Sequence, residues 1–195
     1  RVFFLSHRAI EGTIHAMKEA EKLLVFDAIK RVVGPNGWLD KEHDLEPFLN
    51  EARGLWRGEC EMIVSPANTD EIKSVVSICA DAEIAITPQS GNTGLVGGST
   101  PHGGIVLSTR RMSKIHDIDP IDNTMTVEAG CILADIQNAA SEVDRLFPLS
   151  LAAEGSCRIG GNLSTNAGGI QVLRYGNARD LVLGLEVVLP DGALW

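Results

Sequence analysis

Short apolar runs alternate along the chain with stretches in which apolar residues recur every three or four positions. Residues 62–64, 84–86 and 105–107 are wholly apolar, and residues 125–129 are mostly β-branched or apolar. Runs of this length with no helical periodicity are typical of strands, so four short strands are predicted. The second of them is expected to end at Pro88.

Three stretches carry helical periodicity. Residues 7–33 have apolar positions roughly on one side and stop at a Gly-Pro-Asn-Gly sequence. Asn68 or Thr69 is suited to cap a second helix, which runs to about Cys79, and residues 132–143 predict a third. Helices that alternate with strands predict an α+β fold, a mixed sheet with helical cover.

Two parts of the chain affect its division into units. Residues 38–58 are polar and irregular, and predict only short helix and loop. We therefore divide the chain into an N-terminal segment, 1–57, and a second unit, 58–195. Residues 181–189 predict a strand, and Pro190-Asp191-Gly192 predicts a reversal into a hairpin. Because an unpaired strand exposes backbone groups, we expect a second sheet subdomain to start here and the chain to be truncated.

Composition restricts the classes of partner. With 44% hydrophobic and 22% charged residues, the chain suits one or two globular units. Its net charge of −9 argues against nucleic acid or an anionic membrane surface as partner, so a bound polyanion would have to be held by local geometry. Apolar runs are too short for a membrane span or a secretory signal, which favours a cytoplasmic location.

The usual catalytic and metal-binding side chains form no cluster in the sequence. Cys60, Cys79, Cys131 and Cys157 are widely spaced, so we expect reduced, partly buried thiols rather than a zinc or dithiol site. The histidines form no metal-binding pair and are interpreted as surface or loop residues. No catalytic residue and no metal ligand is singled out. The five histidines are His7, His15, His43, His102 and His116.

A glycine-rich segment, here called the first loop, follows the second predicted strand. Glycines allow the backbone to approach a ligand and to adopt positive φ, so successive N–H groups can converge on phosphate oxygens. Hydroxyl and amide side chains of the segment would add donors. The alternative is a mobile linker, but a linker would not be expected to hold two apolar residues. Neither a Walker loop nor the Gly-x-Gly-x-x-Gly fingerprint is present. The first loop comprises Pro88, Gln89, Ser90, Gly91, Asn92, Thr93, Gly94, Leu95, Val96, Gly97, Gly98 and Ser99.

A second glycine segment, residues 155–169, again mixes paired glycines with Ser, Thr and Asn. Together with the first loop, with Leu-Arg-Tyr-Gly at 173–176 and with the stretch 183–192, it resembles the FAD-binding domain of the vanillyl-alcohol oxidase and p-cresol methylhydroxylase superfamily. Within that superfamily, the residues of the two glycine segments are most similar to the branch of D-2-hydroxyglutarate dehydrogenase, D-lactate dehydrogenase and the glycolate oxidase FAD subunit. The resemblance covers roughly residues 58–195, the N-terminal part of such a domain.

The resemblance implies a set of FAD contacts. The first loop would wrap the pyrophosphate with backbone amides, and Pro148 and Leu149 would approach the flavin. Ser150 and Ala152 depart from the Asp and Gly of some relatives. Asn92, where some relatives carry a histidine, implies non-covalent FAD. The second segment and its continuation would line the flavin, ribityl chain and remaining wall through Gly155, Ser156, Ile159, Gly160, Gly161, Asn162, Thr165, Asn166, Gly168, Gly169, Tyr175 and Gly176.

The resemblance also implies a reaction. Relatives oxidise a D-2-hydroxyacid to a 2-oxoacid, with the C2 hydride passing to flavin and a protein base taking the hydroxyl proton. The base, any divalent metal and the substrate-carboxylate ligands would lie in a C-terminal half that is not part of this sequence. The electron acceptor is unspecified and a homodimer is left open. Two alternatives remain: another alcohol as substrate of the same superfamily, or a non-catalytic FAD-binding module.

Overall fold

The computed structural model describes residues 19–195, and its centre is a four-stranded sheet in the order β1-β2-β4-β3. The strands are β1 (Trp38–Leu39), β2 (Met62–Val64), β4 (Ile105–Ser108) and β3 (Ile86–Gln89). β2, β4 and β3 are parallel, whereas β1 is antiparallel to β2. The mixed sheet expected from the sequence is therefore confirmed.

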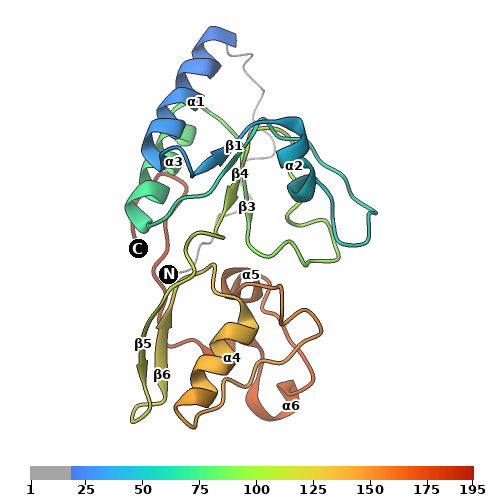
Figure 1. Cartoon of the computed structure of the whole chain (residues 1–195), viewed down its shortest axis with the longest axis vertical. Coiled ribbons are helices and arrows are strands. Elements are labelled where there is room, and N and C mark those ends of the chain that lie inside the picture. Colours follow the sequence, from blue (N-terminus) through green and yellow to red (C-terminus); the bar gives the residue numbers. More distant parts are fainter. Residues whose placement is uncertain (1–18) are drawn as a thin grey trace.

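Helices cover both faces of this sheet (Figure 1). α1 (Glu19–Val33) and α3 (Thr69–Asp81) pack on one face, where Met62 and Val64 of β2 join their apolar side chains in one core. α2 (Glu42–Leu49) packs on the other face against Ile63. Side chains alternate across a strand, so a strand covered on both faces is apolar throughout. This explains the uninterrupted runs in β2 and β4.

A second group of elements follows β4. β5 (Ile115–Asp119) and β6 (Thr124–Val127) form an antiparallel pair, and α4 (Leu133–Glu142) packs beside them. α5 (Ile159–Ser164), α6 (Val172–Tyr175) and the 3-10 turn η1 (Ala178–Leu181) complete this group. It has its own core, which includes Leu133 and Ile136. Figure 1 shows the two groups one beyond the other, joined through the chain between β4 and β5.

Several predictions of local structure need correction. The strand predicted at 181–189 is wrong: residues 178–181 form η1, and the described chain pairs only the end of this stretch, where Val188 bridges Leu194. The predicted hairpin does form, and its tip contacts α3 through Ser77 and the carbonyl of Asp191 at 3.4 Å. The second glycine segment is not loop throughout, because it contains α5.

The other helices and strands that were predicted agree with the structure to within a few residues. Of the helix expected over residues 7–33, residues 19–33 form α1, and the part before residue 19 lies outside the described residues. β3 begins at Ile86 rather than at residue 84 and continues through Pro88 to Gln89. β5 was not predicted, because its sequence is largely polar and only its two isoleucines are apolar.

Candidate cofactor site

The first loop leaves the sheet at the carboxyl end of β3, which is the edge where ligands usually bind in parallel α/β sheets. Ser90 lies 3.0 Å from Thr109, which directly follows β4, so the loop begins between two neighbouring strand ends. Asn92 and Gly97 adopt positive φ, 52° and 71°. These two positions turn the backbone in the way that makes anion-binding concavities.

Three polar side chains of the first loop bond within the protein. Gln89 is buried and donates to the carbonyls of Phe48 at 2.9 Å and Ser99 at 3.1 Å. Asn92 donates to the carbonyl of Asn50 at 2.8 Å and accepts from the Ser99 hydroxyl at 2.9 Å. These side chains fix the shape of the loop, and a direct contact of theirs with a cofactor stays a prediction.

The structure brings the two glycine segments together. A Cβ on Gly91 would lie 2.6 Å from the carbonyl oxygen of Ser156, so the backbones touch there. Ser90 lies against Gly160 and Gly161, whose Cβ positions would be 3.3 and 3.4 Å from its side chain. At Gly91, only glycine permits an approach this close. Segments 65 residues apart, as with Gly91 and Ser156, therefore form one continuous surface.

The rest of the predicted site extends away from this contact. Ser150, next to Pro148 and Leu149, accepts a hydrogen bond from Ile170 at 3.1 Å, and a Cβ on Gly169 would lie 1.9 Å from the same carbonyl oxygen. Thr165 bonds back to Gly161 at 2.9 Å. A second group is tied to η1 and to the turn before it rather than to the first loop. The backbone N–H of Arg179 donates to the Asn166 side chain. A Cβ on Gly168 would meet the Asn177 side chain, and a Cβ on Gly176 would meet that of Asp180. Tyr175, next to Gly176, ends α6.

The donor set of the first loop fits a diphosphate such as that of FAD. Within the described part of the chain, the backbone N–H groups of residues 91–99 make no hydrogen bond. A Cβ would meet no atom within 4 Å at Gly94, Gly98 or Gly155, so the backbone there is open to a ligand. Asn162 is 6% exposed, and its buried Oδ1 has no hydrogen-bond partner among the described residues. Buried polar atoms are normally satisfied, so Asn162 is suited to accept a hydrogen bond from a bound molecule.

Two arginines bring positive charge to the place where the segments meet. Arg158, whose backbone lies beside Gly91, donates to the carbonyl of Gly130. The guanidinium of Arg110 stacks 4.3 Å over the ring of Phe48. Partial burial, and then repulsion by the charge of Arg158, lower the pKa of Arg110. An anion beside them would relieve this repulsion.

The thiols of the described chain lack the surroundings of reactive groups. All four cysteines are free, and burial raises the pKa of Cys60 to about 11 and of Cys79 to about 12. Burial also raises the pKa of Cys131 and Cys157. A thiol with a raised pKa is a poor nucleophile at neutral pH. His116 lies 3.1 Å from Glu128, and His7 and His15 lie outside the described residues.

Sequence reasoning missed the contribution of residues before position 58. Phe48, Asn50 and Trp56 all contact the first loop. A Cβ on Gly97 would lie 3.1 Å from the ring of Trp56. Their partners lie 41 or more positions later, and no local pattern reports such a pairing. The division of the chain at 57/58 stays a prediction about domains. Residues on both sides of it contribute to the site.

Comparisons with known proteins agree with this geometry. Residues 60–195 match the family described as "FAD binding domain". The chain is 39% identical over 166 residues to a probable mitochondrial D-2-hydroxyglutarate dehydrogenase of Oryza sativa subsp. indica, covering 85% of the chain and 30% of that protein. It is 46% identical over 137 residues to a mitochondrial D-2-hydroxyglutarate dehydrogenase of Danio rerio, covering 70% and 26%. A putative mitochondrial D-lactate dehydrogenase of Schizosaccharomyces pombe is 39% identical over 173 residues, with 85% and 33% covered.

Solved structures support the fold. An alkyldihydroxyacetonephosphate synthase superposes with a TM-score of 0.78 at 19% identity, covering 86% of this chain and 33% of that one. p-Cresol methylhydroxylase with bound substrate gives 0.76 at 23% identity, covering 92% and 36%. Both carry the vanillyl-alcohol oxidase type of FAD-binding fold, as expected from the sequence. The chain thus spans about a third of the length of the proteins it matches.

The predicted cytoplasmic location is contradicted, because these dehydrogenase relatives are named as mitochondrial enzymes. The prediction rested on the shortness of apolar runs, which tests only for secretion and membrane insertion. Mitochondrial targeting segments are amphipathic and arginine-rich, so that criterion does not detect them. Among residues 19–195, no helix combines the length and apolarity that crossing a bilayer requires.

Proposed function

The chain belongs to the FAD binding domain family of the vanillyl-alcohol oxidase and p-cresol methylhydroxylase superfamily, and from this premise we propose that it is part of a dehydrogenase that oxidises a D-2-hydroxyacid to the 2-oxoacid. The single observation that carries the substrate class is the identity of about 40% to D-2-hydroxyglutarate and D-lactate dehydrogenases. D-2-Hydroxyglutarate, D-lactate and glycolate are the candidate substrates.

In this proposal, the described residues bind the cofactor and orient it. The N–H groups of the first loop hold the diphosphate, because they are unpaired and the backbone at Gly94 and Gly98 is open. Arg110 and Arg158 offset its charge. Residues 148–176, which include the second segment, hold the remainder and exclude water, with Asn162 accepting a hydrogen bond. Bound FAD supplies the acceptor for the C2 hydride.

The whole protein is the right object for a test of activity, because the chain covers only 26–33% of these relatives. We expect the full-length protein to purify with the visible absorption of flavin. Under anaerobic conditions, D-2-hydroxyglutarate, D-lactate or achiral glycolate should bleach that absorption, and an artificial dye should restore it. The L enantiomers of 2-hydroxyglutarate and lactate serve as controls.

The outcomes separate the alternatives. If no 2-hydroxyacid bleaches the flavin but another alcohol does, the family assignment stands and the proposed substrate class is replaced. A bound flavin that no alcohol reduces would favour a non-catalytic FAD-binding module. Fold alone does not decide between these, because the same fold carries several chemistries.

A further inference from the structure

The turn formed by residues 50–57 is organised around one buried carboxylate. Glu51 is 4% exposed and accepts hydrogen bonds from the backbone N–H groups of Arg53 at 3.0 Å and Leu55 at 3.3 Å. It also accepts from Nε of Arg53 at 3.1 Å. Burial by itself would raise the pKa of Glu51, but the hydrogen bonds from Arg53 and Leu55 outweigh it and lower that pKa. The carboxylate therefore stays charged and fixes the direction of the guanidinium.

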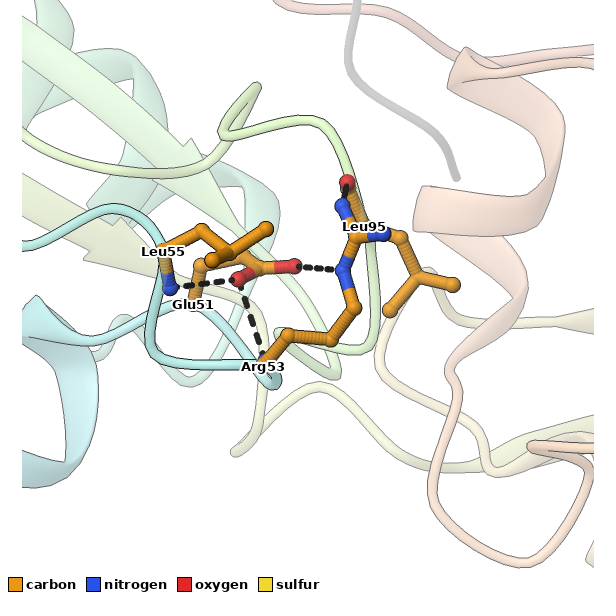
Figure 2. A network of polar contacts seen from close by, with 4 residues as sticks. All are labelled: Glu51, Arg53, Leu55 and Leu95. Atoms are coloured by element: carbon orange, nitrogen blue, oxygen red, sulfur yellow. Dashed lines mark hydrogen bonds and ion pairs between the residues drawn. The ribbon is translucent and has the colours of Figure 1, made fainter.

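The other end of that guanidinium reaches the first loop. Figure 2 shows Arg53 between Glu51 and Leu95, with its terminal nitrogen donating to the Leu95 carbonyl. The pairing spans 42 positions of sequence. The Arg53 side chain is 49% exposed, so the link crosses a surface that solvent can reach and not a packed core.

This hydrogen bond holds the tip of the first loop, residues 93–96, to the turn formed by residues 50–57. Asn92 anchors one side of the tip through Asn50, and Trp56 packs against Gly97 on the other. Within the described chain, residues 93–96 make no hydrogen bond other than the one from Arg53 to Leu95. Leu95 and Val96 are 48% and 84% exposed, so packing holds the tip only weakly.

We propose that Arg53, oriented by Glu51, is a positioning residue that holds the tip of the first loop in the shape that binds the FAD diphosphate. The bond uses the Leu95 carbonyl and leaves the N–H groups of the tip available to an anion. A loop that is ordered before binding loses less conformational entropy when it binds, which increases affinity without a new contact to the ligand. This inference rests on the proposed function, since it concerns the same cofactor.

The test compares Arg53 with Arg57 in the full-length protein stripped of flavin. Arg57 lies four positions later in the same turn, and its guanidinium pairs with Glu46 at 2.9 Å on the exposed surface; among the described residues it makes no hydrogen bond to the first loop. Titration with FAD, followed by the quenching of flavin fluorescence, gives the Kd and the stoichiometry. We expect Arg53→Ala to raise the Kd for FAD about tenfold, because a hydrogen bond to a charged group is lost, and Arg57→Ala to change it less than about twofold.

Two further measurements separate positioning from damage to the fold. Arg53→Lys keeps the charge but cannot bond Glu51 and Leu95 in the same fork-like way, so its Kd should fall between those of the wild type and Arg53→Ala. At saturating FAD, each variant should bind as much FAD per chain as the wild type. A general folding defect would instead lower that stoichiometry.

Equal Kd values for Arg53→Ala and Arg57→Ala would overturn the inference, and so would an Arg53→Ala protein whose stoichiometry falls while its Kd stays at the wild-type value. Neither result would affect the proposed function. A wild-type protein that binds no FAD would overturn both.

Discussion

At the scale of single residues, the site depends on how closely two backbones can approach. Gly91 touches the second glycine segment at Ser156, and a methyl group there would lie 2.6 Å from a carbonyl oxygen and 2.9 Å from the Cα of Cys157. Both are backbone atoms, so neither can move aside as a flexible side chain would. Three residues later, Gly94 faces open space.

We therefore expect Gly91→Ala to separate the two segments, and Gly94→Ala to leave the fold unchanged. Overpacking of this kind costs about 1–3 kcal/mol, which lowers the thermal midpoint by roughly 5 °C in a domain of this size. Differential scanning fluorimetry of the full-length apoprotein measures it. Similar midpoints for the two variants would contradict the contact between the segments.

The sequence made the residue types of the site predictable but not their partners. Glycines with Ser, Thr and Asn after a strand indicated a backbone cradle, and the structure places that cradle at the end of β3. What each side chain does was not predictable, because the contacts are long-range. Asn92, for example, bonds Asn50 in a stretch whose sequence has no clear pattern.

At the scale of elements, prediction succeeded where burial is one-sided or complete and failed where tertiary contacts decide. β2 and β4 are covered on both faces, and β2 and residues 105–107 of β4 are apolar. α5 was missed because two of its six residues are glycine, a poor helix former. Gly160 is needed for a close approach to Ala129, because a Cβ there would lie 2.9 Å from the carbonyl oxygen of Ala129. Residues 181–189 are rich in Val and Leu, but among the described residues only the end of this stretch pairs, with residues 193–195, and β propensity gives no strand without a neighbour.

α3 offers a direct test of a predicted element boundary. Asn68 accepts from the N–H of Glu71 at 2.9 Å, and the Glu71 carboxylate accepts from the N–H of Ala67 at 2.7 Å. Removing an N-cap side chain costs typically about 1 kcal/mol. Asn68→Ala should therefore lower the thermal midpoint by roughly 3 °C.

Asn138 in α4 provides the matched control, because it is exposed within a helix and alanine is the better helix former there. Asn138→Ala should leave the midpoint unchanged or raise it slightly. If both variants behave alike, Asn68 contributes nothing as a cap.

At the scale of the whole molecule, the two groups of elements meet at the candidate site. The first loop belongs to the sheet covered by α1, α2 and α3, whereas the second segment belongs to the group around α4 (Figure 1). The chain between them is closely packed, since a Cβ on Gly130 would lie 2.0 Å from the carbonyl oxygen of Thr109. The relative placement of two cores depends on such contacts, which local periodicity does not encode.

This arrangement predicts how FAD is held. The first loop contains no His, Cys or Tyr, and its central Asn92 is committed to Asn50 and Ser99. Cys157, in the second segment, is 2% exposed, and burial raises the pKa of its thiol, so it is a poor nucleophile for attachment to flavin. Acid precipitation of the full-length holoprotein should therefore release all of its FAD into the supernatant, where chromatography identifies it as intact FAD. A protein band that keeps flavin fluorescence in a denaturing gel would show a covalent bond, and its position in a peptide map would show whether these segments or another part of the protein provide it.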